Sequence, residues 1–226
     1  MAPTWAEWVR AGSGTRVARR LGPRPVAPLE LYEFETCPFC RKVREAIQVL
    51  DLEVQVRPCP KRGVRFRREV EARGGRAQFP YLVDHDAGVS LYESDAIVRH
   101  LFERYGRGRP PWPLGTGSLD TALSMCAGLA HPAEGTFVEA STPPEQPLEL
   151  FADEGGAASR KLRARLSSLE LSYLLKPAAR GSARAEALAR RGLEPPTLFD
   201  PNVGVELTDV VEALAHLDRY RAVGAE

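Results

Sequence analysis

The sequence has few cysteines, almost no net charge and no long hydrophobic run. Its 226 residues include cysteines only at positions 37, 40, 59 and 126, which does not resemble the disulfide framework of a small secreted protein. We therefore expect an intracellular protein in a reducing compartment. No segment approaches the roughly 18 apolar residues of a membrane-spanning helix, so no membrane span is expected. The formal net charge of +1 gives no general indication of nucleic-acid binding.

The N-terminal region is rich in arginine. Residues 1–28 contain five arginines and one acidic residue, and they lack the apolar core of a signal peptide. This composition is compatible with the remnant of an organelle-targeting segment, and equally with a basic arm packed on the first domain.

Two of the cysteines lie where a predicted strand passes into a predicted helix. Residues 29–34 alternate between apolar and polar side chains, which favours a strand. The apolar residues at positions 43, 46, 47 and 50 have the i, i+3, i+4, i+7 spacing of an amphipathic helix. Between them stands Cys37-Pro38-Phe39-Cys40, in which Pro38 suits the first helical position.

This placement has chemical consequences for Cys37. The free N–H groups and the dipole at a helix start stabilise an anion, so we expect the pKa of the Cys37 thiol to be lowered. Arg41, Lys42 and Arg44 are expected to add positive charge nearby. Cys40, one turn further on, could attack a mixed disulfide formed at Cys37. The alternatives are a buried structural pair or half of a zinc site, although the chain contains no second CxxC or CxxH.

The pattern that follows completes a known fold. Residues 52–57 alternate as a strand, 67–73 form a short helix, 81–84 and 89–92 form a hairpin, and a last helix begins at Ser94, a natural N-cap. The resulting order, β-α-β-α-β-β-α up to Gly106, is typical of an α/β thioredoxin fold of the glutaredoxin type.

The chain then repeats itself after a linker at 107–147, which contains an apolar segment that we expect to form a short helix at 119–131. Residues 148–151 match 29–32 at an offset of 119 positions, and from 196 onward the matching offset is 116. We therefore expect an arm at 1–28 and two tandem domains, at 29–106 and 148–226. The second copy carries Gly156, Ser159 and Ala178 where the first has its cysteines, and Asp209-Val210 where the first has Glu93-Ser94, so we expect no redox activity there.

These motifs point to a family. Cys37-Pro38-Phe39-Cys40, Phe79-Pro80 and Glu93-Ser94-Asp95-Ala96-Ile97 resemble the glutaredoxin-like N-terminal domain of glutathione transferases. The whole chain resembles more closely a group of proteins of photosynthetic organisms that carry two such domains in tandem. The resemblance implies glutathione as cofactor and the chloroplast stroma as a location.

The resemblance also implies roles for single residues. Pro80 corresponds to the family's cis-proline, which would let the backbone of Phe79 pair with the cysteinyl part of glutathione. Glu93 and Ser94 correspond to the pair that holds its γ-glutamyl end, with the helix N-terminal amides receiving the carboxylate. Read in isolation, Ser94 is a helix cap and Pro80 a turn proline.

The leading hypothesis is a glutathione-dependent thiol–disulfide oxidoreductase. The Cys37 thiolate would attack a disulfide or a glutathionylated protein, and glutathione or Cys40 would resolve the product. One rival is a binding module in which Cys37, Cys40 and glutathione hold an iron–sulfur cluster between two subunits. Another is an adaptor that docks partners on the second copy. Cys59 is either a third thiol or metal ligand near Cys37, or a small apolar residue.

Overall fold

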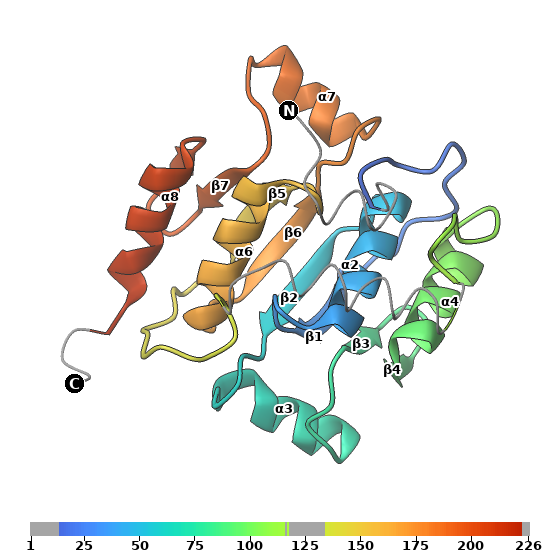
Figure 1. Cartoon of the computed structure of the whole chain (residues 1–226), viewed down its shortest axis with the longest axis horizontal. Helices are drawn as coiled ribbons and strands as arrows, with labels where there is room; N and C mark the ends of the chain where they lie inside the picture. The colour runs from blue at the N-terminus through green and yellow to red at the C-terminus, as the bar shows by residue number, and fades with distance from the viewer. Residues whose placement is uncertain (1–13, 116, 118–133, 223–226) are drawn as a thin grey trace.

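The computed structural model describes residues 14–115, 117 and 134–222 (Figure 1). The elements of the first half are β1 (Leu29–Glu33), α2 (Pro38–Leu50), β2 (Val54–Pro58), α3 (Arg65–Gly74), β3 (Tyr81–Asp84), β4 (Val89–Tyr92) and α4 (Ser94–Tyr105). Those of the second half are β5 (Leu148–Ala152), α6 (Ala157–Ser168), β6 (Tyr173–Pro177), α7 (Ala183–Arg190), β7 (Thr197–Asp200), β8 (Val205–Leu207) and α8 (Val210–Leu217), followed by a 3-10 turn at Asp218–Tyr220.

The predicted α/β fold class is confirmed, and both halves follow the order β-α-β-α-β-β-α. Within the predicted helix at 38–50, Val43, Ala46, Ile47 and Leu50 are fully buried, as their spacing requires. Complete burial of a valine, isoleucine or leucine side chain stabilises the fold by about 1.5–3 kcal/mol. The helix predicted at 119–131, like Cys126, lies outside the described residues.

All strands of the described residues belong to one eight-stranded sheet in the order β4-β3-β1-β2-β6-β5-β7-β8. Each half has a central parallel pair, β1–β2 or β5–β6, extended on one side by an antiparallel hairpin. The halves meet where β2 and β6 pair antiparallel, with Val54 opposite Leu175 and Val56 opposite Tyr173. The sheet therefore continues from one half into the other without an edge.

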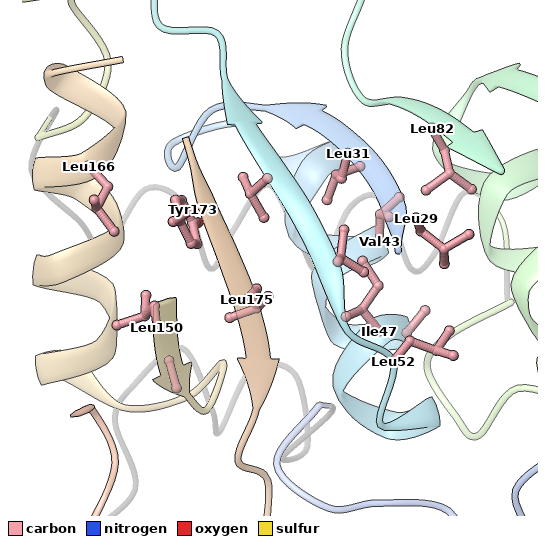
Figure 2. Close-up of a cluster of buried hydrophobic side chains, with 14 of the residues drawn as sticks. Leu29, Leu31, Val43, Ile47, Leu52, Leu82, Leu150, Leu166, Tyr173 and Leu175 are labelled. Carbon is pink, nitrogen blue, oxygen red and sulfur yellow. The ribbon is translucent and has the colours of Figure 1, made fainter. Parts of the chain in front are cut away.

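The hydrophobic core also continues across this junction. One cluster of buried side chains includes Leu31 and Ile47 of the first half together with Leu150, Leu166 and Leu175 of the second. Figure 2 shows these residues on β1, α2, β5, α6 and β6, with β2 and β6 side by side between them. The division into domains at 29–106 and 148–226 stays a prediction, because the described residues share one sheet and one large core.

The two halves correspond in register. Leu29 pairs with Val54 in β1–β2, and Leu148 pairs with Tyr173 in β5–β6, so both members of the pair shift by 119 positions. The offsets derived from the sequence therefore place corresponding residues at corresponding points of the sheet.

A correspondence that the sequence comparison missed lies in the segments before β1 and β5. Residues 14–17 read Gly-Thr-Arg-Val and residues 135–138 read Gly-Thr-Phe-Val. Gly14 and Gly135 both have a positive φ, of 76° and 79°, and an added Cβ would approach a helix backbone to about 3 Å in each case. Glycine is required at both positions for the same reason, since other residues rarely adopt this conformation and would also collide.

Each of these two arms bridges both halves of the protein. Arg16 forms a β-bridge with Arg180 of the second half, and Phe137 forms the equivalent bridge with Lys61 of the first. The amide of Ala18 then donates to the carbonyl of Val49 at 2.8 Å, as Glu139 does to Ser168 at 2.7 Å. The described part of the N-terminal basic segment is thus a packed arm that contacts both halves.

No helix within the described ranges is long and apolar enough to cross a membrane.

Candidate functional site

Three tyrosines in a row across the sheet mark the end at which the predicted site residues meet. Tyr32 of β1 is opposite Tyr81 of β3, and Tyr81 is opposite Tyr92 of β4. Their rings pack with centroids 5.7 Å and 4.5 Å apart. Because the neighbouring strands run antiparallel, the chain beyond Tyr32, before Tyr81 and beyond Tyr92 lies at the same end of the sheet. These are the segments that carry the CPFC motif, Phe79-Pro80 and Glu93-Ser94.

Cys37 is the N-cap of α2, as its position before Pro38 predicts. Its sulfur accepts a hydrogen bond from the backbone N–H of Cys40 at 3.3 Å, so the thiol takes the place of the oxygen that usually caps a helix. Cys37 is 5% exposed and Cys40 is fully buried. Both are free thiols, and Cys37 is the one that solvent reaches.

The pKa values of the two thiols are shifted in opposite directions. The Cys40 thiol donates a hydrogen bond that lowers the pKa of Cys37; burial opposes this effect, and the backbone N–H of Cys40 adds to it. Burial raises the pKa of Cys40 well above its usual range, and the hydrogen bond to Cys37 raises it further. The arrangement separates a nucleophile from a proton donor, because only the thiolate attacks a disulfide.

The expectation that Arg41, Lys42 and Arg44 assist Cys37 is wrong, because all three side chains are paired with carboxylates. Arg41 pairs with Glu45 at 3.0 Å, and Lys42 pairs with Asp95 of α4 at 2.7 Å. Arg44 is buried among carboxylates, including Glu33, whose charge raises the pKa of Cys37. The acidity of Cys37 therefore comes from hydrogen bonds at the helix start and not from neighbouring cations.

Phe79 and Pro80 lie at the same end of the sheet as the CPFC motif, and the peptide bond between them is cis. The ring of Phe79 contacts that of Phe34, three residues before Cys37, edge to face at a centroid distance of 6.3 Å. The guanidinium of Arg67 covers the Phe79 ring at 4.7 Å. These contacts hold the ring of Phe79 between the segment that follows β1 and helix α3.

The start of α4 differs from its prediction in one respect. Ser94 is not the N-cap but the first helical residue, and the cap is Glu93, which has a φ of 67° and makes no side-chain capping bond. The first backbone bond of the helix runs from Ile97 to the carbonyl of Glu93, at 3.0 Å. Among the described residues, no side chain accepts a hydrogen bond from the preceding amides of the first turn, so these amides can donate to an outside acceptor. Sequence pattern favours serine as a cap but does not reveal a strained neighbour.

Two side-chain contacts hold this helix start in place. The Gln78 side chain donates to Glu93 at 2.5 Å, which ties the Phe79-Pro80 segment to the cap of α4. The Lys42–Asp95 ion pair ties α2 to the first turn of α4. Together with the Phe34–Phe79 contact, they join the three predicted site segments into one closed arrangement.

The second half keeps the cis-proline, at Pro195-Pro196, but its helix starts differ from those of the first half. The N-cap of α6 is Gly156, and Asp153 accepts hydrogen bonds from the Gly156 amide at 2.9 Å and from the Ser159 hydroxyl at 2.5 Å. The N-terminus of α8 is closed by the Asp209 side chain, which accepts from Val211 and from the following amide. The start of α6 therefore carries no thiol, and Asp153 occupies the amide of its cap residue; the start of α8 is capped by a side chain, whereas Glu93 makes no such bond at the start of α4.

Cys59 faces a different environment. It is fully buried in a second hydrophobic cluster that includes Tyr32, Phe66 and Val70, and its thiol donates to the carbonyl of Arg57 at 3.4 Å. Burial raises its pKa well above the usual range. The structure supports the interpretation of Cys59 as a small apolar residue.

A buried ion cluster beneath the site was not predicted. Arg44 of α2 contacts Glu33 and lies 3.1 Å from Glu154, while Arg163 of α6 lies 2.9 Å from Glu35. Burial raises the pKa of Glu33 to about 7, against the attraction of Arg44. The signal that could have revealed the cluster is the repeat, because both the arginines and Glu35 and Glu154 correspond at the offset of 119.

A metal centre finds no support in the described ranges, where no group of three or more His, Cys, Asp or Glu side chains could hold a metal ion. The iron–sulfur interpretation therefore has no structural observation behind it.

Part of the chain is similar to known proteins. Residues 31–111 match the family described as Glutathione S-transferase, N-terminal domain. Among solved structures, the chain is similar to a glutathione transferase of Bombyx mori, BmGSTD1, at 29% identity and a TM-score of 0.34. That match covers 38% of this chain and 39% of the Bombyx mori chain. No curated protein gives a match.

The matched family domain contains every predicted site residue, from Cys37 to Ser94. It ends within the segment after α4, so residues 112–226 lie outside the match. Because the similarity covers well under half of either chain, the activity of a whole glutathione transferase does not transfer to this protein by similarity alone.

Proposed function

We propose that the protein is a glutathione-dependent thiol–disulfide oxidoreductase in which Cys37 is the nucleophile. The observation that carries the proposal is the pair of thiols at the start of α2, one with a lowered pKa and 5% exposed, the other buried with a raised pKa. A site that only activates glutathione for attack on another molecule would not need this second thiol. The family match of residues 31–111 supports glutathione as the partner.

The proposed reaction consists of two thiol–disulfide exchanges. The Cys37 thiolate attacks the glutathione sulfur of a glutathionylated protein, the old disulfide breaks, and the protein thiolate leaves and takes a proton from water. A second glutathione thiolate then attacks the glutathione sulfur of the Cys37–glutathione disulfide; the bond to Cys37 breaks, Cys37 leaves as a thiolate, and the new bond completes oxidised glutathione. The raised pKa of Cys40 favours glutathione over Cys40 as the resolving thiol.

The residues around Cys37 fit glutathione. The uncapped N-terminus of α4 offers amides to a carboxylate, and the Ser94 hydroxyl lies in the same first turn. The exposed Glu93 carboxylate is suited to the α-ammonium group, and the backbone of Phe79 before the cis-Pro80 to the cysteinyl part. The contrast with α8, which Asp209 caps, favours binding to the first half alone. We propose accordingly that the second half is a copy of the same fold without a nucleophile.

The test is reduction of a glutathionylated peptide with glutathione, coupled to regeneration of reduced glutathione. Cys37→Ser should abolish the reaction, whereas Cys59→Ser, which alters an equally buried thiol in another cluster, should leave it within about twofold of wild type. Ser94→Ala should raise the KM for glutathione without slowing alkylation of Cys37 by iodoacetamide. Undiminished turnover by the Cys37 variant would refute the mechanism.

A location in the chloroplast stroma stays a prediction that rests on the resemblance.

A further inference from the structure

A cavity of about 750 Å³ lies at the opposite end of α2 from Cys37. Its apolar lining includes Val49 and Leu50 at the end of α2 and Phe102 of α4. The rest is supplied by the N-terminal arm, by the segment after α4 and by Arg180. Figure 1 shows the arm, in dark blue, beside the green segment that follows α4, and the bridge between Leu21 and Gly106 joins them.

The charged lining of this cavity is entirely basic among the described residues. Six exposed arginines line it and no acidic residue does: Arg16, Arg19, Arg20, Arg107, Arg109 and Arg180. Within the described part of the chain, none of the six side chains has an ion pair or hydrogen bond. Like charges gathered around a concave surface repel one another and focus a positive potential into it. An anion in the cavity would relieve that repulsion.

The backbone that carries these arginines is held in place. The amide of Val17 donates to the carbonyl of Arg180 at 3.1 Å, and the amide of Arg180 donates to Thr15 at 3.0 Å. The amide of Gly22 donates to Tyr105 at 2.9 Å, at the start of the segment with Arg107 and Arg109. The three segments are therefore linked by main-chain bonds before any ligand arrives, which reduces the entropic cost of binding.

The second half contains the corresponding cavity and serves as an internal comparison. It measures about 490 Å³ and is lined by Gly135, Val138 and Ser168, the counterparts of Gly14, Val17 and Val49. Its charges are mixed, and Arg165 is paired with Glu139 at 2.7 Å and with Asp218. The fold thus builds this cavity without needing a cluster of unpaired arginines, so the cluster in the first half calls for another explanation.

We propose that the basic cavity is a binding site for a small phosphorylated ligand with a planar ring, the chemistry of a nucleoside polyphosphate. Arginine presents a planar fork of donors that matches phosphate oxygens, and several such forks converge here. Trp112 lines the same cavity with 59% of its surface exposed and offers an aromatic face on which a base can stack. The volume lies within the roughly 300–1,000 Å³ of small-molecule sites.

The proposal is independent of the thiol chemistry, because the cavity shares no residue with the predicted glutathione site. It is tested by calorimetric titration of the full chain with ATP, tripolyphosphate and adenosine, without divalent cations, in the presence and absence of glutathione. We expect saturable binding of one ATP per chain that glutathione does not displace, weaker binding of tripolyphosphate, and no measurable binding of adenosine.

Matched variants identify the site. The triple variant Arg16→Gln, Arg109→Gln, Arg180→Gln should weaken ATP binding about tenfold or more. The triple variant Arg99→Gln, Arg190→Gln, Arg219→Gln removes the same charge from exposed positions outside the cavity and should change the affinity less than twofold. Trp112→Ala should weaken the binding of ATP but not of tripolyphosphate.

Other outcomes would overturn the proposal. Absence of saturable binding for both ATP and tripolyphosphate would show that the cavity is not a binding site. Equal losses of ATP affinity in the two triple variants would show that binding depends on the overall positive charge and not on this cavity. Displacement of ATP by glutathione would place the ligand at the other site. Equal affinity for ATP and tripolyphosphate would refute the role of Trp112, and tighter binding of a short duplex oligonucleotide than of ATP would make the surface a nucleic-acid contact instead.

Discussion

The guanidinium of Arg44 lies 3.1 Å from the carboxylate of Glu154, although 110 positions separate them in the chain and both side chains are almost completely buried. The corresponding pair, Arg163 and Glu35, lies 2.9 Å apart across the same junction. The offset of 119 converts each residue of one pair into its counterpart in the other. Each half thus supplies the arginine of one ion pair and the glutamate of the other. Glu33 adds a third carboxylate on the side of the thiols.

Removing one arginine of this cluster should be costly. Arg44→Met leaves Glu33 buried without its ion-pair partner and leaves Glu154 to Arg163, 3.7 Å away; breaking a buried pair in this way costs about 3–5 kcal/mol. The free energy of unfolding from urea titration measures the effect. Arg191→Met, which breaks an exposed pair with Glu206, is the control and should cost less than about 1 kcal/mol. A loss below that value for Arg44→Met would show that the cluster does not hold the halves together.

The same cluster should give the stability a particular pH dependence. Burial raises the pKa of Glu33 to about 7, against the attraction of Arg44, from an ordinary value of 4.5. Between these values the folded protein holds a proton that the unfolded chain releases, so the contribution of Glu33 to stability decreases as pH rises from about 4.5 to about 7.

The substitution Glu33→Gln removes this titration. The difference in unfolding free energy between wild type and variant should therefore change with pH over that interval and become constant above it. Urea titrations at several pH values between 5 and 8 measure the difference. A difference that is constant from pH 5 to 8 would contradict a raised pKa for Glu33.

Much of this molecule could be predicted from sequence because its signals are local. Periodicity located the helix 38–50, and the strand–CPFC–helix order placed Cys37 at its start, where the structure has it. The ion cluster could not be predicted in the same way. Glu33 and Arg44 read as ordinary charged residues at the end of a strand and on a helix, and the contact of Arg44 with Glu154 depends on how the two halves pack together.

The cap residue of α4 and the basic cavity were missed for similar reasons. The sequence contains a good capping residue, but the left-handed conformation of Glu93 moves the cap back by one residue. The arginines of the cavity come from positions 16–20, 107–109 and 180, which are brought together by the arm and its bridge to the second half. Sequence alone could have aligned the Gly-Thr motifs at 14 and 135 and so suggested that the arm belongs to the repeat.

The hydrogen bond from the Cys40 thiol should control the acidity of Cys37. Cys40→Ala removes this donor and should raise the pKa of Cys37, whereas Cys40→Ser supplies a hydroxyl donor in its place and should raise it less. The pH dependence of alkylation by iodoacetamide measures that pKa, with the Cys59→Ser variant as the control for nonspecific change. Because glutathione is proposed to resolve the intermediate, Cys40→Ser should also keep most of its turnover. Equal pKa values for Cys37 in the Ala and Ser variants would refute the role of the donor.

A last pair of residues tests whether the two halves unfold together. Asp84 accepts hydrogen bonds from His100 at 2.8 Å and from Tyr105 at 2.7 Å, and Asp200 accepts the equivalent bonds from His216 and Tyr220. Burial tends to raise both carboxyl pKa values, but the hydrogen bonds outweigh it and lower them. These contributions are therefore present above the ordinary pKa of an aspartate and are lost as pH falls through the lowered folded values.

At neutral pH, Asp84→Asn and Asp200→Asn should each destabilise the protein by about 1–3 kcal/mol, while Asp218→Asn, in an exposed pair with Arg165, should cost less than about 1 kcal/mol. The decisive reading is the shape of the unfolding curve. Because β2 pairs with β6 and one core spans the junction, either substitution should shift a single transition seen by both far-UV circular dichroism and tryptophan fluorescence. Two transitions, of which each substitution shifts only one, would show that the halves are independent folding units despite their common sheet.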